Sequence, residues 1–270
     1  MSETAPDGTV YTVTGNPDGA AVVLVHGLGM NHAMWQWQQP ALEKDYKVVA
    51  YDLVGHGATP PDDAPSLTRF AIQLRDLIDH LGLKSVAVIG FSLGGMIVRR
   101  FAMDFPDRLW AIGILHSAHQ RLGQEPDDVK KRVDLVRREG PQATVEVALQ
   151  RWLTDDYRAA NPDVTKMIRQ WILANDHKVY PGNYQVLLDG VDELVAPDPP
   201  IDCPALVVTG TDDPGQTPAM SERISAEISG STLAVLPGLR HMGFVEQPGV
   251  YNTLILDFLA DAETHRGNGG

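Results

Sequence analysis

Short apolar segments recur along this chain, separated by longer stretches with the periodicity of amphipathic helices. The apolar segments occupy residues 11–13, 20–25, 47–51, 85–89, 109–115, 205–209 and 232–236. Most are continuous rather than alternating, which is typical of strands buried on both faces of a parallel sheet. Strands that alternate with helices predict an α/β fold with a mostly parallel, doubly wound sheet. Residues 11–13 are interpreted as an edge strand.

Residues 120–199 contain helical patterns but no convincing strand. Val129, Val133 and Val136 recur at helical spacing beside charged residues, which predicts an amphipathic helix. An Asn-Pro-Asp sequence at 161–163 supplies a cap residue, a first-turn proline and an acid, and so predicts the start of another helix.

This all-helical segment divides the chain into three parts. Residues 1–119 and 200–262 are predicted to form the α/β core, and residues 120–199 a helical cap, or lid, over the carboxyl edge of the sheet. Residues 263–270 have no apolar side chain to anchor them, so we expect a flexible tail.

A glycine-flanked serine joins the apolar run 85–89 to the helical run that begins at Leu93. The sequence there is Gly90-Phe91-Ser92-Leu93-Gly94. A nucleophile elbow needs this composition, because the sharp strand-to-helix turn strains the serine backbone and only glycine leaves room around it. Ser92 is therefore the candidate nucleophile.

A serine hydroxyl needs a base within hydrogen-bond reach and an acid that orients the base. Asp213 follows the strand 205–209, and His241 follows the strand 232–236, so both are predicted at the same sheet edge as Ser92. The order Ser, Asp, His is the one associated with this elbow. Adjacent Asp212 is interpreted as a turn or capping residue.

Other histidines compete with His241 for the role of base. His116 and His119 lie near the same edge and are kept as alternatives that also line the pocket. The loop 115–121 contains no carboxylate, which favours Asp213 as the acid. Two backbone N–H groups, those of Leu28 and Leu93, are predicted to form the oxyanion hole for a tetrahedral intermediate.

With these residues in place, the chain resembles the α/β-hydrolase superfamily from residue 11 to about residue 259. Residues 52–59 are similar to its D-x-R-G-H-G-x-S segment, with Val54 and Thr59 replacing the usual residues. Residues 90–95 and 245–248 are most similar to the branch of 3-oxoadipate enol-lactonase-like enzymes and small carboxylesterases. In the fold that this resemblance implies, the lid is inserted between the sixth and seventh strands, here 109–115 and 205–209.

The resemblance implies hydrolysis of a small carboxylic ester or lactone through an acyl-enzyme, with no cofactor and no metal. A serine at position 92 excludes the aspartate-dependent dehalogenases and epoxide hydrolases of this fold. Alternatives on the same triad are a carbon–carbon hydrolase of the meta-cleavage type, an amide hydrolase and a perhydrolase. A ligand receptor of this fold is a further alternative, and it would turn over slowly.

Several bulky side chains are candidates for the substrate pocket. They are Trp35, Phe91, Met96, His119, Trp152, Trp171 and Met242. Four arginines, Arg121, Arg151, Arg158 and Arg169, are candidates to hold a substrate carboxylate, and the sequence does not choose among them.

Charge and composition narrow the classes of partner. The chain of 270 residues carries 22 basic and 35 acidic side chains, a net charge of −13. Such a surface repels phosphate backbones and anionic lipids, so we expect a small-molecule substrate, no nucleic acid and no membrane surface. A homo-oligomer is compatible with the sequence. The N-terminal residues lack a signal-peptide pattern and Cys203 is the only cysteine, which together favour the cytoplasm.

Overall fold

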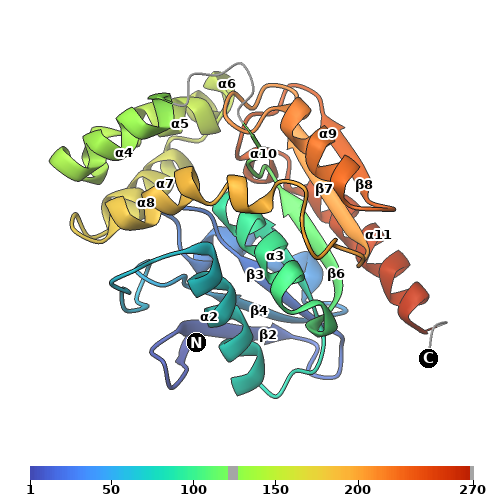
Figure 1. The fold of residues 1–270 in the computed structure, drawn as a ribbon. Helices are drawn as coiled ribbons and strands as arrows, with labels where there is room; N and C mark the ends of the chain where they lie inside the picture. Colours follow the sequence, from blue (N-terminus) through green and yellow to red (C-terminus); the bar gives the residue numbers. More distant parts are fainter. Residues whose placement is uncertain (121–126, 268–270) are drawn as a thin grey trace.

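The computed structural model describes residues 1–120 and 127–267, and within them eight strands form one sheet (Figure 1). The strand order is β1-β2-β4-β3-β5-β6-β7-β8. Strands β3 to β8 are parallel to one another, whereas β2 is antiparallel to both β1 and β4. The predicted mostly parallel α/β architecture is therefore confirmed. The strands are β1 (Glu3–Thr4), β2 (Val10–Gly15), β3 (Ala21–Val25), β4 (Lys47–Tyr51), β5 (Val86–Phe91), β6 (Leu109–Leu115), β7 (Ala205–Gly210) and β8 (Thr232–Leu236).

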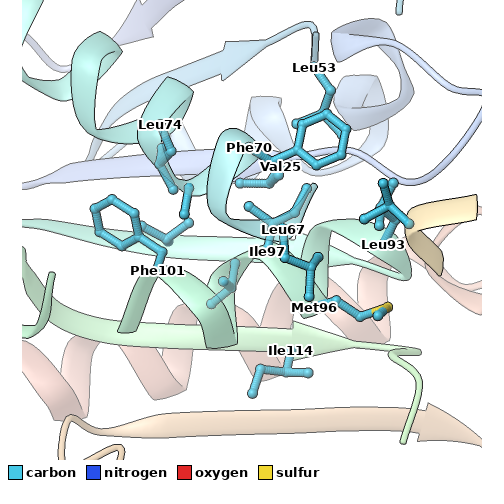
Figure 2. Packing of buried hydrophobic residues seen from close by; sticks show 14 of the residues in the cluster. Val25, Leu53, Leu67, Phe70, Leu74, Leu93, Met96, Ile97, Phe101 and Ile114 are labelled. Carbon is cyan, nitrogen blue, oxygen red and sulfur yellow. The ribbon is translucent and has the colours of Figure 1, made fainter. Parts of the chain in front are cut away.

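Helices cover both faces of the sheet because successive strand residues point to opposite sides. In β3, Val23 and Val25 belong to one apolar cluster, and Val22 and Leu24 belong to the other. Helices α2 (Leu67–His80), α3 (Leu93–Asp104) and α9 (Pro218–Glu227) pack on the first face. Figure 2 shows the packing of α2 and α3 around Ile97. The second face is covered by the short helices η1 (His32–Trp37) and α1 (Gln39–Leu42) and by α11 (Pro248–Gly267).

The predicted edge strand at residues 11–13 is longer and lies one position inside the sheet. Strand β2 pairs with β4 on one side and with the two-residue strand β1 on the other. Glu3 and Thr4 are both exposed and have no apolar pattern, so the sequence did not indicate a strand there.

A helical insert lies between β6 and β7, as the pattern of residues 120–199 predicts. Figure 1 shows its helices gathered at one end of the sheet. They are α4 (Asp127–Glu139), η3 (Pro141–Ala143), α5 (Val145–Trp152), α6 (Asp155–Ala160), α7 (Pro162–Leu173), α8 (Tyr180–Asp189) and η4 (Asp192–Leu194). Val133 and Val136 of α4 are fully buried, so the predicted amphipathic helix turns its apolar side inward.

The C-terminal helix α11 differs from the expected tail. It continues past Ala262 to Gly267, because backbone hydrogen bonds extend the helix although Glu263 and Thr264 are exposed. Residues 268–270 of the expected tail lie outside the described part of the chain. No helix among the described residues is both long and apolar enough to cross a lipid bilayer.

Candidate active site

Ser92 lies at the sharp turn between β5 and α3, where the chain leaves the carboxyl edge of the sheet. Its φ of 56° is in the region that side chains rarely adopt, as a nucleophile elbow requires. Two contacts hold this backbone: Ser92 N–H donates to Leu115 O at 2.8 Å, and Ser117 Oγ donates to Ser92 O at 3.1 Å. A Cβ atom on Gly94 would collide with the carbonyl oxygens of Val25 and His26, which explains the glycine there.

Asp213 and His241 meet in the loops that follow β7 and β8. His241 Nδ1 lies 2.7 Å from Asp213 Oδ2. The other oxygen, Asp213 Oδ1, accepts the backbone N–H groups of Gly215 and Gln216, each at 2.9 Å. Both side chains are almost fully buried, so the carboxylate is fixed in position and the imidazole is oriented by it.

A second imidazole shares the Asp213 carboxylate. His116, at the end of β6, places Nδ1 2.8 Å from Asp213 Oδ2 and Nε2 2.7 Å from Tyr251 Oη. Because a carboxylate only accepts, the proton of His116 is on Nδ1, and Nε2 accepts from the Tyr251 hydroxyl. The sequence placed His116 near this edge as an alternative base or pocket residue, but it gave no indication of Tyr251.

Burial and neighbouring charges shift the pKa of Asp213 in opposite directions. Burial favours its neutral form, yet the neighbouring His241 and His116, through charge and hydrogen bonds, hold the pKa of this carboxyl far below its ordinary value. Burial lowers the pKa of His116, although the bond to Asp213 opposes this shift. The site therefore contains an ionised Asp213 and a neutral His116 at neutral pH.

Ser92 and His241 line the same cavity, which has a volume of about 390 Å³ and lies between the sheet edge and the cap. Ser92 is 7% exposed, and its side chain faces this space. Within the described residues Ser92 Oγ makes no hydrogen bond, so the Ser92–His241 bond is not formed in this structure. Such bonds are often long without substrate and shorten when it binds.

One of the two predicted oxyanion-hole residues lines this cavity, and the other follows Ser92 in the chain. Leu28 lines the cavity directly, and Leu93 is the first residue of α3, immediately after Ser92. Neither backbone N–H donates to an acceptor within the part of the chain that the structure describes. Backbone N–H groups without an acceptor are available to bind an oxyanion, so the oxyanion hole of Leu28 and Leu93 stays a prediction.

Five of the seven bulky pocket candidates divide into two groups. Phe91 and Trp152 line the cavity. Trp35, Met96 and Met242 are instead fully buried in the apolar clusters on the two faces of the sheet; Met96 is labelled in Figure 2. These three side chains point into the core, which the spacing of residues along the chain could not distinguish from the cavity.

The two remaining candidates, Trp171 and His119, make their contacts outside the cavity lining. Trp171 packs edge-on against Trp37, with ring centroids 6.4 Å apart. His119 Nε2 donates to Glu227 Oε1 at 3.0 Å, and its Nδ1 accepts from Arg223 Nε at 3.2 Å. His119 is thus bound on the α9 side, away from the cavity lining.

His116, Asp213 and His241 bring potential metal ligands within 4.8 Å of one another. In the observed arrangement both Nδ1 atoms donate protons to Asp213, so a metal ion would have to replace these two hydrogen bonds. The donor set therefore fits a proton-transfer site better than a metal centre.

Comparisons with known proteins agree with the fold. A sequence model described as the alpha/beta hydrolase family matches residues 22–254. The chain is 29% identical over 243 residues to 3-oxoadipate enol-lactonase 2 of Acinetobacter baylyi, covering 90% of this chain and 89% of that protein. The crystal structure of the enol-lactonase from Burkholderia xenovorans is similar with a TM-score of 0.88 and 28% identity, over 96% of this chain and 100% of that one. An esterase from Thermogutta terrifontis, determined with malate bound, gives a TM-score of 0.85 and 26% identity over 97% and 98% of the two chains.

Proposed function

Because this chain belongs to the alpha/beta hydrolase family, we propose that it is a serine hydrolase that cleaves a small carboxylic ester or lactone through an acyl-enzyme. The observation that carries the proposal is the cavity shared by Ser92 and His241, with His241 held by Asp213. The enol-lactonase and esterase relatives support the same class of substrate.

The proposed first half-reaction follows from the protonation of His241. Its Nδ1–H is donated to Asp213, so the lone pair of the neutral ring is on Nε2, the atom available to Ser92. As Ser92 Oγ attacks the carbonyl carbon, His241 Nε2 takes the hydroxyl proton. The carbonyl oxygen becomes an oxyanion that accepts from the N–H groups of Leu28 and Leu93.

The first half-reaction ends when the tetrahedral intermediate collapses and its C–O bond to the leaving oxygen breaks. His241 gives its proton to this oxygen, which departs as an alcohol from an ester or stays attached to the acyl group in a lactone. The second half-reaction uses the same residues, with water in place of Ser92 as the attacking group. Water then attacks the acyl-enzyme while His241 again accepts a proton, and Ser92 is regenerated. Asp213 stays ionised throughout and stabilises the imidazolium that forms in each half.

Steady-state kinetics with short-chain p-nitrophenyl esters and small lactones test the proposal. We expect Ser92→Ala to lower kcat by about 10⁴-fold or more, because all covalent catalysis is lost. Ser221→Ala is the matched control: this buried serine lies on α9, and its replacement should leave activity unchanged. Equal activity of Ser92→Ala and the unmodified protein would refute the proposed nucleophile. A preference for meta-cleavage products over every ester and lactone would instead favour a carbon–carbon hydrolase.

A further inference from the structure

The cap contributes two arginines to the cavity that contains Ser92. Arg132 of α4 and Arg151 of α5 are half-buried, and both line this cavity. Of the other arginines singled out in the sequence, Arg158 is paired with Asp155 at 2.7 Å and Arg169 is paired with Glu146. Arg121 lies outside the described residues. The structure thus distinguishes Arg151 from these candidates and adds Arg132, which sequence reasoning did not single out.

Arg151 lies directly against the loop that carries Asp213. A Cβ atom added to Gly215 would be 2.5 Å from Arg151 Nη2, so this guanidinium contacts the β7–α9 loop. Among the described residues Arg151 has no hydrogen-bonded or ion-paired partner. Arg132 Nε donates to Tyr184 Oη at 3.1 Å and has no carboxylate partner in the same part of the chain.

The nearby carboxylates are already engaged. Asp213 accepts hydrogen bonds on both oxygens. Asp128, at the exposed side of the cavity, lies 3.5 Å from Lys131 Nζ. In the open groove on the outer side of Arg151, Asp155 pairs with both Arg158 and Arg240.

The electrostatics of Arg151 are consistent with a bound anion. Burial, followed by the positive charge of Arg132, lowers the pKa of Arg151 below its ordinary value, although Tyr184, Asp213 and Asp128 partly oppose this shift. Two neighbouring cations withdrawn from water destabilise each other, and an anion between them would relieve both the repulsion and the lost solvation. Planar guanidinium groups suit a carboxylate, which can accept two parallel N–H bonds.

We propose that Arg151 and Arg132 bind a carboxylate of the substrate, so that this hydrolase acts on esters or lactones carrying a free carboxylate in the acyl part. The inference rests on the proposed function, because it uses the cavity in which Ser92 would react. The carboxylate is held on the cap side, while the reacting carbonyl lies at Ser92 on the sheet side.

A pair of matched substrates tests this assignment. Mono-(4-nitrophenyl) glutarate and 4-nitrophenyl valerate share a leaving group and chain length, but the first ends in a carboxylate where the second ends in a methyl group. We expect the unmodified protein to prefer the glutarate ester in kcat/KM. Arg151→Gln should reduce the ratio of the two kcat/KM values by about tenfold or more, and adding Arg132→Gln should reduce it further.

Two control variants separate charge recognition from damage to the fold. Arg151→Lys keeps the charge but loses the planar pair of N–H donors, so its preference for the glutarate ester should lie between those of the unmodified protein and Arg151→Gln. Arg158→Gln changes an arginine outside the cavity and should leave the ratio within about twofold of the original. The assignment is overturned if the ratio is the same in the unmodified protein, in Arg151→Gln and in the double variant.

A binding measurement keeps this test independent of turnover. Calorimetric titration of Ser92→Ala protein with free glutarate should show binding that weakens about tenfold when Arg151→Gln is added. Equal glutarate affinity with and without Arg151 would contradict the carboxylate site. If Ser92→Ala retains ester hydrolysis while the arginine variants lose glutarate binding, the nucleophile is wrong and the carboxylate site stands.

Discussion

At the scale of single residues, the Asp213 carboxylate stands out because it accepts four hydrogen bonds. One oxygen accepts from two imidazoles and the other from two backbone N–H groups. This arrangement stabilises the ionised carboxylate and fixes the direction from which His241 approaches. Tyr251 adds one more hydrogen bond to this network, because its hydroxyl donates to His116 Nε2.

Tyr251→Phe should destabilise the protein by about 1–3 kcal/mol, since it leaves His116 Nε2 buried without a donor while the aromatic ring is kept. Urea unfolding at pH 7 measures this change. Tyr157→Phe is the control: its half-buried hydroxyl makes one 3.3 Å bond to Val245 O, and its loss should cost less. Equal losses of unfolding free energy in the two variants would show that the Tyr251–His116 bond stabilises the protein no more than the Tyr157–Val245 bond.

Gly94→Ala tests the close packing beneath the elbow. The added methyl group would collide with two backbone carbonyl oxygens, which cannot move aside as a flexible side chain would. We expect a destabilisation of about 1–3 kcal/mol by urea unfolding. Gly249→Ala, where a Cβ meets nothing within 4 Å, should be neutral or slightly stabilising. A Gly94→Ala protein as stable as the original would contradict this packing.

At the scale of elements, the end of α5 is tied to the segment that carries His241. Met242 N–H donates to Trp152 O at 2.8 Å. Glu246, in α10 (Gly243–Glu246), accepts from Thr154 N–H at 2.8 Å and from Thr154 Oγ1 at 2.5 Å. The cap and the histidine loop are therefore expected to move as one unit.

Glu246→Ala should release this connection. Amide hydrogen exchange at Thr154 should become about tenfold faster or more, because its charge-assisted bond is lost. Glu222→Ala, an exposed glutamate of α9, serves as the control and should leave this exchange rate unchanged. Unchanged exchange in Glu246→Ala would indicate that other contacts hold the cap.

Strands, loops and side-chain contacts differ in how well the sequence predicts them. Strands β4, β6 and β8 have the predicted bounds because their runs of β-branched and apolar residues end at a polar residue or at proline. The loops after parallel strands share one edge, so the sequence could bring Asp213 and His241 together. It could not identify the partnership of Tyr251, 135 residues from His116, nor separate Phe91 at the cavity from Met96 in the core. Those distinctions depend on side-chain direction, which appears only when helices are packed.

At the scale of the whole molecule, two buried histidines link folding stability to pH. Burial lowers the pKa of His26 to about 4, and burial together with the charge of His26 lowers that of His56 to about 3. His26 Nε2 accepts Leu53 N–H at 2.9 Å and joins the loops after β3 and β4. In the unfolded chain both histidines titrate near their ordinary value, about 6.5.

Below pH 6.5 these histidines therefore bind protons in the unfolded state but not in the folded state, so the free energy of unfolding falls as the pH is lowered. Between pH 7 and pH 5 we expect each histidine to cost about 2 kcal/mol of unfolding free energy. Urea unfolding at both pH values should show a smaller loss in His56→Gln, and an unchanged loss in the surface control His177→Gln. An identical loss in His56→Gln and the unmodified protein would contradict this assignment.

Mass spectrometry after treatment with a fluorophosphonate shows directly whether Ser92 is the nucleophile activated by His241. We expect one covalent adduct per chain, located on the tryptic peptide 85–99, which contains Ser92. Labelling should be absent in Ser92→Ala and strongly slowed in His241→Gln. An adduct on another residue, or undiminished labelling of Ser92→Ala, would contradict this role of Ser92.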